Sequence, residues 1–217
     1  MNLTAIGAAI VDLDLDGTMV DTLGDFDAVL NTVLHELGLP GVGRAFLSRT
    51  VGRGSEHLIR STLVEVGADA GLYESAWARY QQRYLEVNGD HSAVFPGVVE
   101  GLAALKSRGW KLACLTNKPT AFAIPLLRQK GLHVFFDAVF GGDAFERKKP
   151  DPLPLLKTCE ALGKPPARTL MVGDSSNDAQ AARAAGCPVV LVSYGYNHGE
   201  PVAAAGADRV IDRLDQL

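Results

Sequence analysis

Two acidic side chains follow a short apolar run near the N-terminus of this 217-residue chain. The run from Ala8 to Val11 has the composition of a buried strand, and Asp14 and Asp16 come after it, just before a Gly17-Thr18 turn. Two residues apart along an extended chain, the two carboxylates leave the sheet on the same side. Charges this close repel each other and raise at least one pKa unless a cation lies between them. The stretch therefore indicates either a cation-assisted site or an ordinary surface Asp-Gly turn.

Two further groups of polar residues come later in the chain, one after an apolar run and one before a proline. Thr116 and Asn117 come directly after Leu115, where a hydroxyl and an amide can hold phosphate oxygens without adding charge, although such a pair is also typical of a helix cap. Lys149 stands before a rigid proline, where it is placed to neutralise both a carboxylate and a phosphoryl group. A solvated basic turn is the alternative interpretation of that lysine.

The last of these groups is acidic. Asp174 follows the apolar run 169–172 and is placed to share a hard cation with Asp14. Oxygen-only ligands of this kind suit Mg²⁺. Asp178 begins the next helical stretch. There it either caps the N-terminus of the helix or holds a metal-binding side chain in position without binding the metal itself.

The spacing of apolar residues predicts an α/β fold with a parallel sheet covered on both faces by helices. Between residues 19 and 92 we find helical periodicity and no convincing strand, whereas strands and helices alternate from Phe95 onward. The predicted strands are 8–11, 110–116, 138–140, 168–172, 189–192 and 209–211, and the predicted helices are 26–37, one from 55, 70–87, 98–108, 120–130, 152–162 and 178–185. Ligands of such sheets bind at the carboxyl ends of the strands, which is where the groups above fall.

The composition argues against nucleic-acid-binding, membrane-bound and secreted proteins. The chain is 47% hydrophobic with a formal net charge of −4, which gives no general attraction to nucleic acid or to anionic membranes. Its three cysteines have no pairing or metal-ligand spacing, so we expect buried thiols in a reducing compartment. Met1 to Gly7 lacks a basic region followed by an apolar segment, and no apolar run reaches about 18 residues. We therefore expect a soluble cytoplasmic protein.

Taken together, these groups resemble the four motifs of the haloacid dehalogenase superfamily of phosphotransferases. The matching residues are Asp14-Leu15-Asp16-Gly17-Thr18, Thr116, Lys149-Pro150-Asp151-Pro152, and Gly173-Asp174 with Asp178, in the family's order. The resemblance implies a Rossmann-like core formed by residues 1–18 and 93–217, with residues 19–92 as a small all-helical cap inserted after the first strand.

A second similarity, in the predicted cap, concerns the substrate. Arg49-Thr50-Val51-Gly52-Arg53-Gly54, followed by Glu56 and Leu58-Ile59, is similar to phosphoglycolate phosphatases. It implies hydrolysis of 2-phosphoglycolate, a small phosphorylated metabolite; we expect a monomer or homodimer. Arg53 is the candidate for binding the substrate carboxylate, because a glycine-flanked loop can project a cation into the cleft, and an arginine that merely faces solvent is the alternative. Sugar-phosphate phosphatases, phosphomutases and pyrophosphatases remain alternatives with the same chemistry. A phosphate-accepting signalling receiver is an alternative of another class.

The superfamily resemblance also implies a role for each site residue. Asp14 would attack phosphorus and form an aspartyl-phosphate, while Asp16 would serve as general acid and then general base. Mg²⁺ would be held by Asp14, the Asp16 backbone carbonyl and Asp174. Lys149 would offset the remaining charge, and Thr116 with Asn117 would position phosphoryl oxygens.

Asp12 departs from the family pattern, which has an apolar strand residue at this position. A buried, unpaired carboxylate is costly, so we expect Asp12 to be neutral, paired or hydrated. We interpret it as supporting rather than catalytic, because Gly-Thr follows Asp16 and not Asp14.

Overall fold

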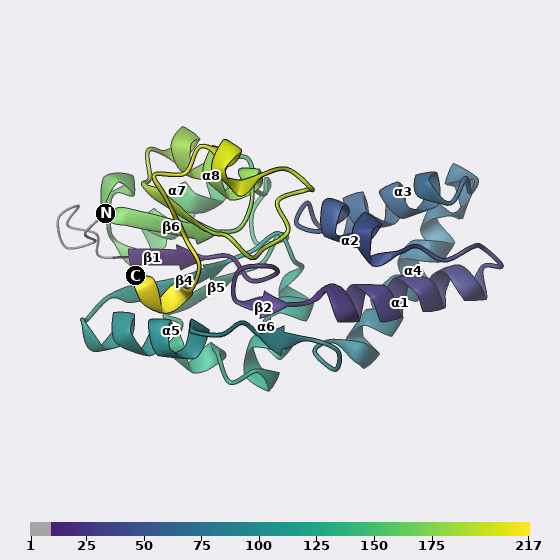
Figure 1. Ribbon diagram of the computed structural model, residues 1–217, viewed down its shortest axis with the longest axis horizontal. Coiled ribbons are helices and arrows are strands. Elements are labelled where there is room, and N and C mark those ends of the chain that lie inside the picture. The colour runs from purple at the N-terminus through teal and green to yellow at the C-terminus, as the bar shows by residue number, and fades with distance from the viewer. Residues whose placement is uncertain (1–9) are drawn as a thin grey trace.

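The computed structural model describes residues 10–217, in which six parallel strands form one sheet (Figure 1). The strands are β1 Ile10–Leu13, β4 Lys111–Leu115, β5 Ala138–Phe140, β6 Thr169–Gly173, β7 Val189–Val192 and β8 Arg209–Ile211. Their order is β5-β4-β1-β6-β7-β8, so the first strand lies in the middle, hydrogen-bonded to β4 on one side and β6 on the other. The strand order reverses at β1, which is the position where such sheets bind ligands.

Helices cover both faces of this sheet. Helices α5 (Val98–Ser107) and α6 (Thr120–Gln129) lie on one face, and α7 (Leu153–Leu162) and α8 (Ser176–Ala185) lie on the other (Figure 1). Side chains alternate along β1, so that Val11 and Leu13 pack with α5 and α6, whereas Ile10 packs against Leu162 of α7. The predicted α/β class with a parallel, doubly covered sheet is therefore confirmed.

The predicted elements of the sheet domain agree with the structure to within one or two residues at their ends. The exception is the first strand, predicted over 8–11: β1 continues to Leu13, and residues 8 and 9 lie outside the described residues. The three cysteines are buried free thiols, as expected. None of the helices within residues 10–217 combines the length and the apolar character that crossing a bilayer requires.

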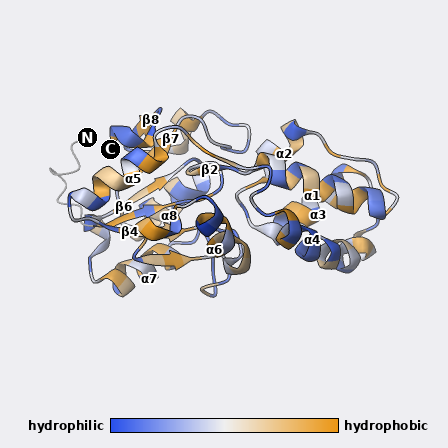
Figure 2. Ribbon diagram, turned by 90° about the horizontal axis from the view of Figure 1, so that it is seen from below, coloured by the Kyte–Doolittle hydropathy of each residue, from blue (hydrophilic) through white to orange (hydrophobic). Residues whose placement is uncertain are grey.

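A separate group of helices stands at the carboxyl end of the sheet, at the right of Figure 1. It consists of α1 Leu23–Glu36, α2 Arg44–Thr50, α3 Ser55–Glu65 and α4 Tyr73–Val87, with a 3-10 turn at Ala70–Leu72. The group has its own apolar cluster, which also takes in Phe122 of α6 and so docks the helices on the sheet domain. In Figure 2 hydrophobic colours lie on β4 and β6, and hydrophilic colours on much of α4. We call this group the cap; its division from the core at residues 18/19 and 92/93 stays a prediction.

Two features of the cap differ from the sequence analysis. The expectation of no strand between residues 19 and 92 is wrong, because β2 (Val20–Asp21) pairs antiparallel with β3 (Ala93–Val94). Two residues are too few to leave a periodic pattern, and this ribbon owes its existence to the two connections between cap and core lying side by side. Helix α2 was also not predicted, since its seven residues show no clear apolar stripe. The remaining structured segments are 3-10 turns at His133–Phe135, Pro166–Arg168, Val202–Ala205 and Leu214–Gln216.

Asp12 lies in the middle of β1 and is fully buried. Neither of its carboxylate oxygens has a hydrogen-bond partner among residues 10–217, and burial raises its pKa well above the ordinary value. Of the three states expected for Asp12, the structure therefore favours the neutral one.

The burial of Asp12 should lower the free energy of unfolding as pH rises, and Asp12→Asn should remove this pH dependence. A carboxyl group whose folded-state pKa is raised stabilises the fold fully only below its unfolded-state pKa, near 3.9, and that contribution is lost as pH rises toward the folded-state pKa. Within this window the free energy of unfolding of Asp12→Asn should gain on that of the wild type by about 1.4 kcal/mol per pH unit. Urea denaturation of both proteins across the acid-to-neutral range measures the difference. Parallel pH profiles, or loss of turnover in a folded variant, would contradict this interpretation of Asp12.

Candidate active site

The carboxyl ends of three adjacent strands bring the predicted polar residues together. Asp14 follows β1, where its backbone N–H donates to Val172 O of β6 at 2.9 Å. Thr116 follows β4 directly, and Asp174 follows β6 directly. All three residues are buried. The parallel sheet therefore places at one edge residues that are far apart in the sequence.

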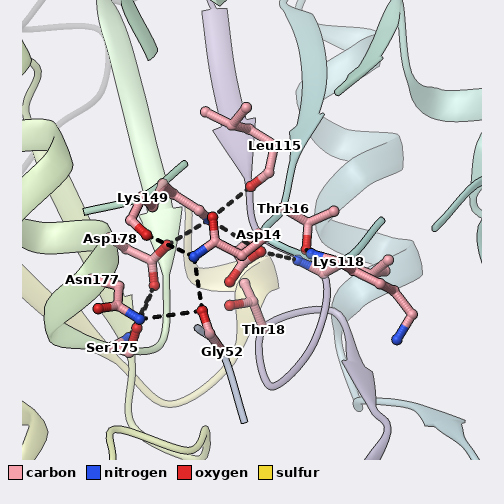
Figure 3. Close-up of polar contacts among 12 residues, drawn as sticks. Asp14, Thr18, Gly52, Leu115, Thr116, Lys118, Lys149, Ser175, Asn177 and Asp178 are labelled. Atoms are coloured by element: carbon pink, nitrogen blue, oxygen red, sulfur yellow. Dashed lines mark hydrogen bonds and ion pairs between the residues drawn. The ribbon is translucent and has the colours of Figure 1, made fainter. Parts of the chain in front are cut away.

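Lys149 is the cation at the centre of this edge (Figure 3). Its Nζ lies 3.1 Å from Asp14 Oδ1, 2.7 Å from Asp178 Oδ1 and 2.7 Å from Leu115 O. The side chain is 2% exposed. Burial disfavours the charged ammonium, but the two carboxylates outweigh this effect and raise the pKa of Lys149 above its ordinary value. Lys149 is therefore a permanent positive charge beside the Asp14 carboxylate.

Asp178 supports this lysine from the first turn of α8. Its Oδ2 accepts hydrogen bonds from Ser175 N at 3.1 Å and Ser175 Oγ at 2.9 Å, which completes a capping box at the start of the helix. Its Oδ1 accepts from Lys149. The carboxylate thus caps α8, which is one of the two roles left open by the sequence, and it also orients the ammonium toward Asp14. Its support of a metal ligand stays a prediction.

Three carboxylates could hold a metal ion. One oxygen each of Asp14, Asp174 and Asp178 lie within 4.8 Å of one another, and all three residues are buried. Burial raises the pKa of Asp14 to about 6 even though Lys149 opposes the shift, and it raises the pKa of Asp174 well above the usual range. The neighbouring carboxylates also repel one another, and a bound cation would relieve that repulsion. Oxygen-only donors suit a hard divalent cation such as Mg²⁺.

Asp174 is held in place by donors from two loops. Thr18 Oγ1 donates to its Oδ1 at 3.3 Å, and Tyr196 N donates to its Oδ2 at 2.6 Å. Gly195 has to be a glycine here, because a Cβ at that position would meet the Asp174 Cβ at 2.1 Å. Backbone and side chain therefore fix this carboxylate toward Asp14.

A cavity opens above these residues, between the sheet and the cap. It is lined by Asp14, Asp16, Phe26, Val51, Gly52, Gly54, Ser55, Leu58, Thr116, Asn117 and Lys118. Its walls combine acidic and amide groups from the core with apolar side chains from the cap, a composition suited to a small polar ligand.

The cap closes over the cavity through the backbone of Gly52. The Gly52 carbonyl accepts hydrogen bonds from Asn117 Nδ2 at 2.9 Å and from Asn177 Nδ2 at 3.2 Å (Figure 3). Asn117 Nδ2 also donates to Lys149 O at 2.7 Å. The Asn117 side chain therefore ties the cap loop to the core. The predicted contact of Thr116 and Asn117 with phosphoryl oxygens stays a prediction.

Two basic residues lie differently from what the sequence suggested. Arg53 is exposed and is not among the residues that line the cavity, so its predicted contact with a substrate carboxylate stays a prediction. Lys118, which the sequence analysis missed, is buried in the cavity wall, where its Nζ donates to Asp16 Oδ1 at 2.9 Å. Its position directly after Thr116-Asn117 was the available signal. Asp16 therefore faces Lys118 rather than the carboxylate cluster, and the proposed metal contact of its backbone carbonyl remains untested.

Comparisons with known proteins agree with one another. The family model described as haloacid dehalogenase-like hydrolase matches residues 11–192. The chain is similar to the phosphoglycolate phosphatase of Thiobacillus denitrificans, 44% identical over 207 residues that cover 94% of this chain and 91% of the relative. It is 41% identical to the plasmid phosphoglycolate phosphatase of Cupriavidus necator, over 100% of this chain and 94% of the relative. A crystal structure of a predicted phosphoglycolate phosphatase from Haemophilus somnus superposes with a TM-score of 0.92 at 31% identity, covering 97% of this chain and 96% of the other.

The charge balance around Lys149 predicts the effect of Lys149→Met. Loss of the ammonium leaves buried carboxylates unpaired, so the free energy of unfolding without metal should fall by about 3–5 kcal/mol. A saturating divalent cation should restore part of the loss, because it binds the folded state and replaces the missing charge. Chemical denaturation with and without Mg²⁺ measures both effects.

Lys157→Met is the matched control for this change. Lys157 pairs with Glu160 on the surface, with exposed fractions of 45% and 72% for the two side chains. Its removal should change the free energy of unfolding by less than about 0.5 kcal/mol. Equal effects of the two substitutions would contradict the central place given to Lys149.

Proposed function

The chain belongs to the haloacid dehalogenase-like hydrolase family, and we propose that it hydrolyses 2-phosphoglycolate to glycolate and phosphate through Asp14. The observation that carries the proposal is the placement of the Asp14 carboxylate at the end of the central strand, 3.1 Å from Lys149, in the floor of the cavity beneath the cap. A nucleophilic carboxylate beside a fixed cation and in a small closed cavity suits attack on a phosphate monoester. The named activity of its relatives, which match nearly the whole chain, supports the choice of ester.

Asp14 is the proposed nucleophile. Its Oδ1 accepts hydrogen bonds from Leu15 N at 2.8 Å and from Lys149, which leaves Oδ2 without a hydrogen-bond partner among residues 10–217. In the first step an Asp14 oxygen bonds to phosphorus as the bond from phosphorus to the glycolate oxygen breaks. In the second step water attacks the aspartyl-phosphate, which releases phosphate and regenerates the carboxylate.

Asp16 is the proposed proton carrier. It lines the same cavity as Asp14 and would protonate the departing glycolate oxygen in the first step. In the second step it would take a proton from the attacking water. The order acid-then-base returns Asp16 to its starting state after each turnover.

Asp14 and Asp174 would hold the Mg²⁺ ion, with Asp178 retained by Lys149 and by the capping box behind them. The ion supplies positive charge that offsets the repulsion between a carboxylate and a phosphate dianion. Lys149 contributes charge at the same place from the protein itself. The hydrogen bond from Asn117 to Gly52 O holds the cap loop over the cavity, and closure of this kind would limit the access of bulk water and strengthen these interactions.

A panel of phosphate esters tests the proposed substrate. With Mg²⁺ present, 2-phosphoglycolate should give the highest kcat/KM among 2-phosphoglycolate, sugar phosphates and pyrophosphate. Chelation should lower kcat by about 100-fold or more, and added Mg²⁺ should restore it. Preference for a sugar phosphate or pyrophosphate would replace the substrate proposed here. A phosphoaspartate that persists for hours would favour the receiver instead.

Asp14→Asn tests the nucleophile. An amide cannot form the acyl phosphate, so kcat should fall by about 1,000-fold or more while the circular dichroism spectrum stays unchanged. Asp12→Asn, two residues earlier on the same strand, is the matched control and should retain turnover. Residual activity of Asp14→Asn close to that of the wild type would exclude the aspartyl-phosphate route.

A further inference from the structure

Lys118 is a buried cation that the proposed chemistry does not use. Its Nζ donates to Asp16 Oδ1 at 2.9 Å and to Tyr84 Oη at 2.6 Å, and the side chain is 2% exposed. The ammonium also lies 4.7 Å from the ring centroid of Phe26 and 4.6 Å from that of Tyr84, both in the cap. An ammonium has three N–H donors, and the third has no hydrogen-bond partner among residues 10–217.

Among residues 10–217, this unused donor belongs to the only cationic side chain that lines the cavity. Lys149 contacts the same cavity only through Asp14, since its own donors go to Asp14, Asp178 and Leu115 O. Arg53 is exposed to solvent. Among the residues that line this cavity, Lys118 is therefore the cation available to a second anionic group on a bound substrate, beyond the phosphoryl group.

We propose that Lys118 binds a carboxylate carried by the leaving group and so selects 2-phosphoglycolate over uncharged esters. This inference rests on the proposed function and adds the residue that recognises the leaving group. Asp16 protonates the leaving oxygen in that function, and Lys118 Nζ is hydrogen-bonded to Asp16. In 2-phosphoglycolate a single methylene separates the leaving oxygen from the carboxylate. A carboxylate that close to the leaving oxygen comes within reach of the same ammonium.

The surroundings of Lys118 would make such a contact strong. Phe26, Val51 and Leu58 form apolar walls around the charged groups, and a charge-assisted hydrogen bond gains strength where water is excluded. The cap supplies Phe26 and Tyr84, whereas the core supplies Lys118 and Asp16. Cap closure therefore completes the carboxylate site, and an ester without an anion at this position gains nothing from it.

The test compares two esters that differ only in this group: 2-phosphoglycolate and 2-hydroxyethyl phosphate. Lys118→Met should lower kcat/KM for 2-phosphoglycolate by about 100-fold, mainly through KM, and should lower it much less for 2-hydroxyethyl phosphate. Lys118→Gln keeps a hydrogen-bond donor beside Asp16 while removing the charge, and should show the same selectivity. Lys157→Met is the matched control and should leave both esters unchanged.

Inhibition by the products gives a readout that does not depend on proton transfer. The inhibition constant for glycolate should rise about 100-fold in Lys118→Gln, whereas that for inorganic phosphate should stay within about twofold. A merely structural role would change both constants or neither.

Two results would overturn the proposal. An equal loss of kcat/KM on both esters would mean that Lys118 acts only through Asp16, and a selective loss in Arg53→Ala rather than in Lys118→Gln would move the carboxylate contact to the cap loop. Failure of the proposed substrate is seen separately, because the wild type itself would then show no preference for 2-phosphoglycolate over 2-hydroxyethyl phosphate.

Discussion

Mutual repulsion of buried carboxylates is the constraint on which the rest of this structure depends. Asp14, Asp174 and Asp178 bring oxygens to within 4.8 Å of one another in a buried place, and Lys149 compensates part of their charge from 3.1 Å and 2.7 Å. Such a cluster is unfavourable to build: burial, and after it the neighbouring carboxylates, raise the pKa values of Asp14 and Asp174. The parallel sheet fixes the strand ends rigidly and so holds the carboxylates together, and a divalent cation, as proposed above, would complete the charge balance.

Close approach of the backbone is what makes the cluster possible. Gly17 adopts φ of +81°, and a Cβ there would meet Asp174 Oδ2 at 2.4 Å. Gly173 is limited in the same way by Asp178, whose Cγ would lie 2.3 Å from an added Cβ. These glycines let two loops and the start of a helix approach one another closely. In the motif Asp-x-Asp-Gly-Thr, the glycine is therefore needed both for its backbone conformation and because there is no room for a side chain.

The core of the site could be predicted from the sequence because its residues sit at the ends of strands. Apolar runs locate the strands, and a parallel sheet brings their carboxyl ends to one edge. Asp14, Thr116 and Asp174, which follow adjacent strands, therefore had to lie close together. The cap contacts could not be predicted in this way, because they depend on how two helical layers dock. Helix α2 and the β2–β3 ribbon are short elements held by tertiary contacts, and the inward position of Lys118 follows from the aromatic rings that cover it. Asp12 shows the opposite limit: the sequence located it on a buried strand, but only the packing around it shows that its oxygens have no hydrogen-bond partner in the part of the chain that the structure describes.

The two buried lysines differ in which parts of the molecule hold them. Lys149 is fixed entirely by core groups, because its ammonium contacts Asp14, Asp178 and the Leu115 carbonyl. Lys118 is shared between core and cap, because it contacts Asp16 on one side and Tyr84 on the other. Charge that serves phosphoryl chemistry common to a whole family belongs on the rigid sheet, where it does not change as the cap moves. Charge that recognises one leaving group belongs at the junction with the cap, because there closure itself can depend on what the cavity holds.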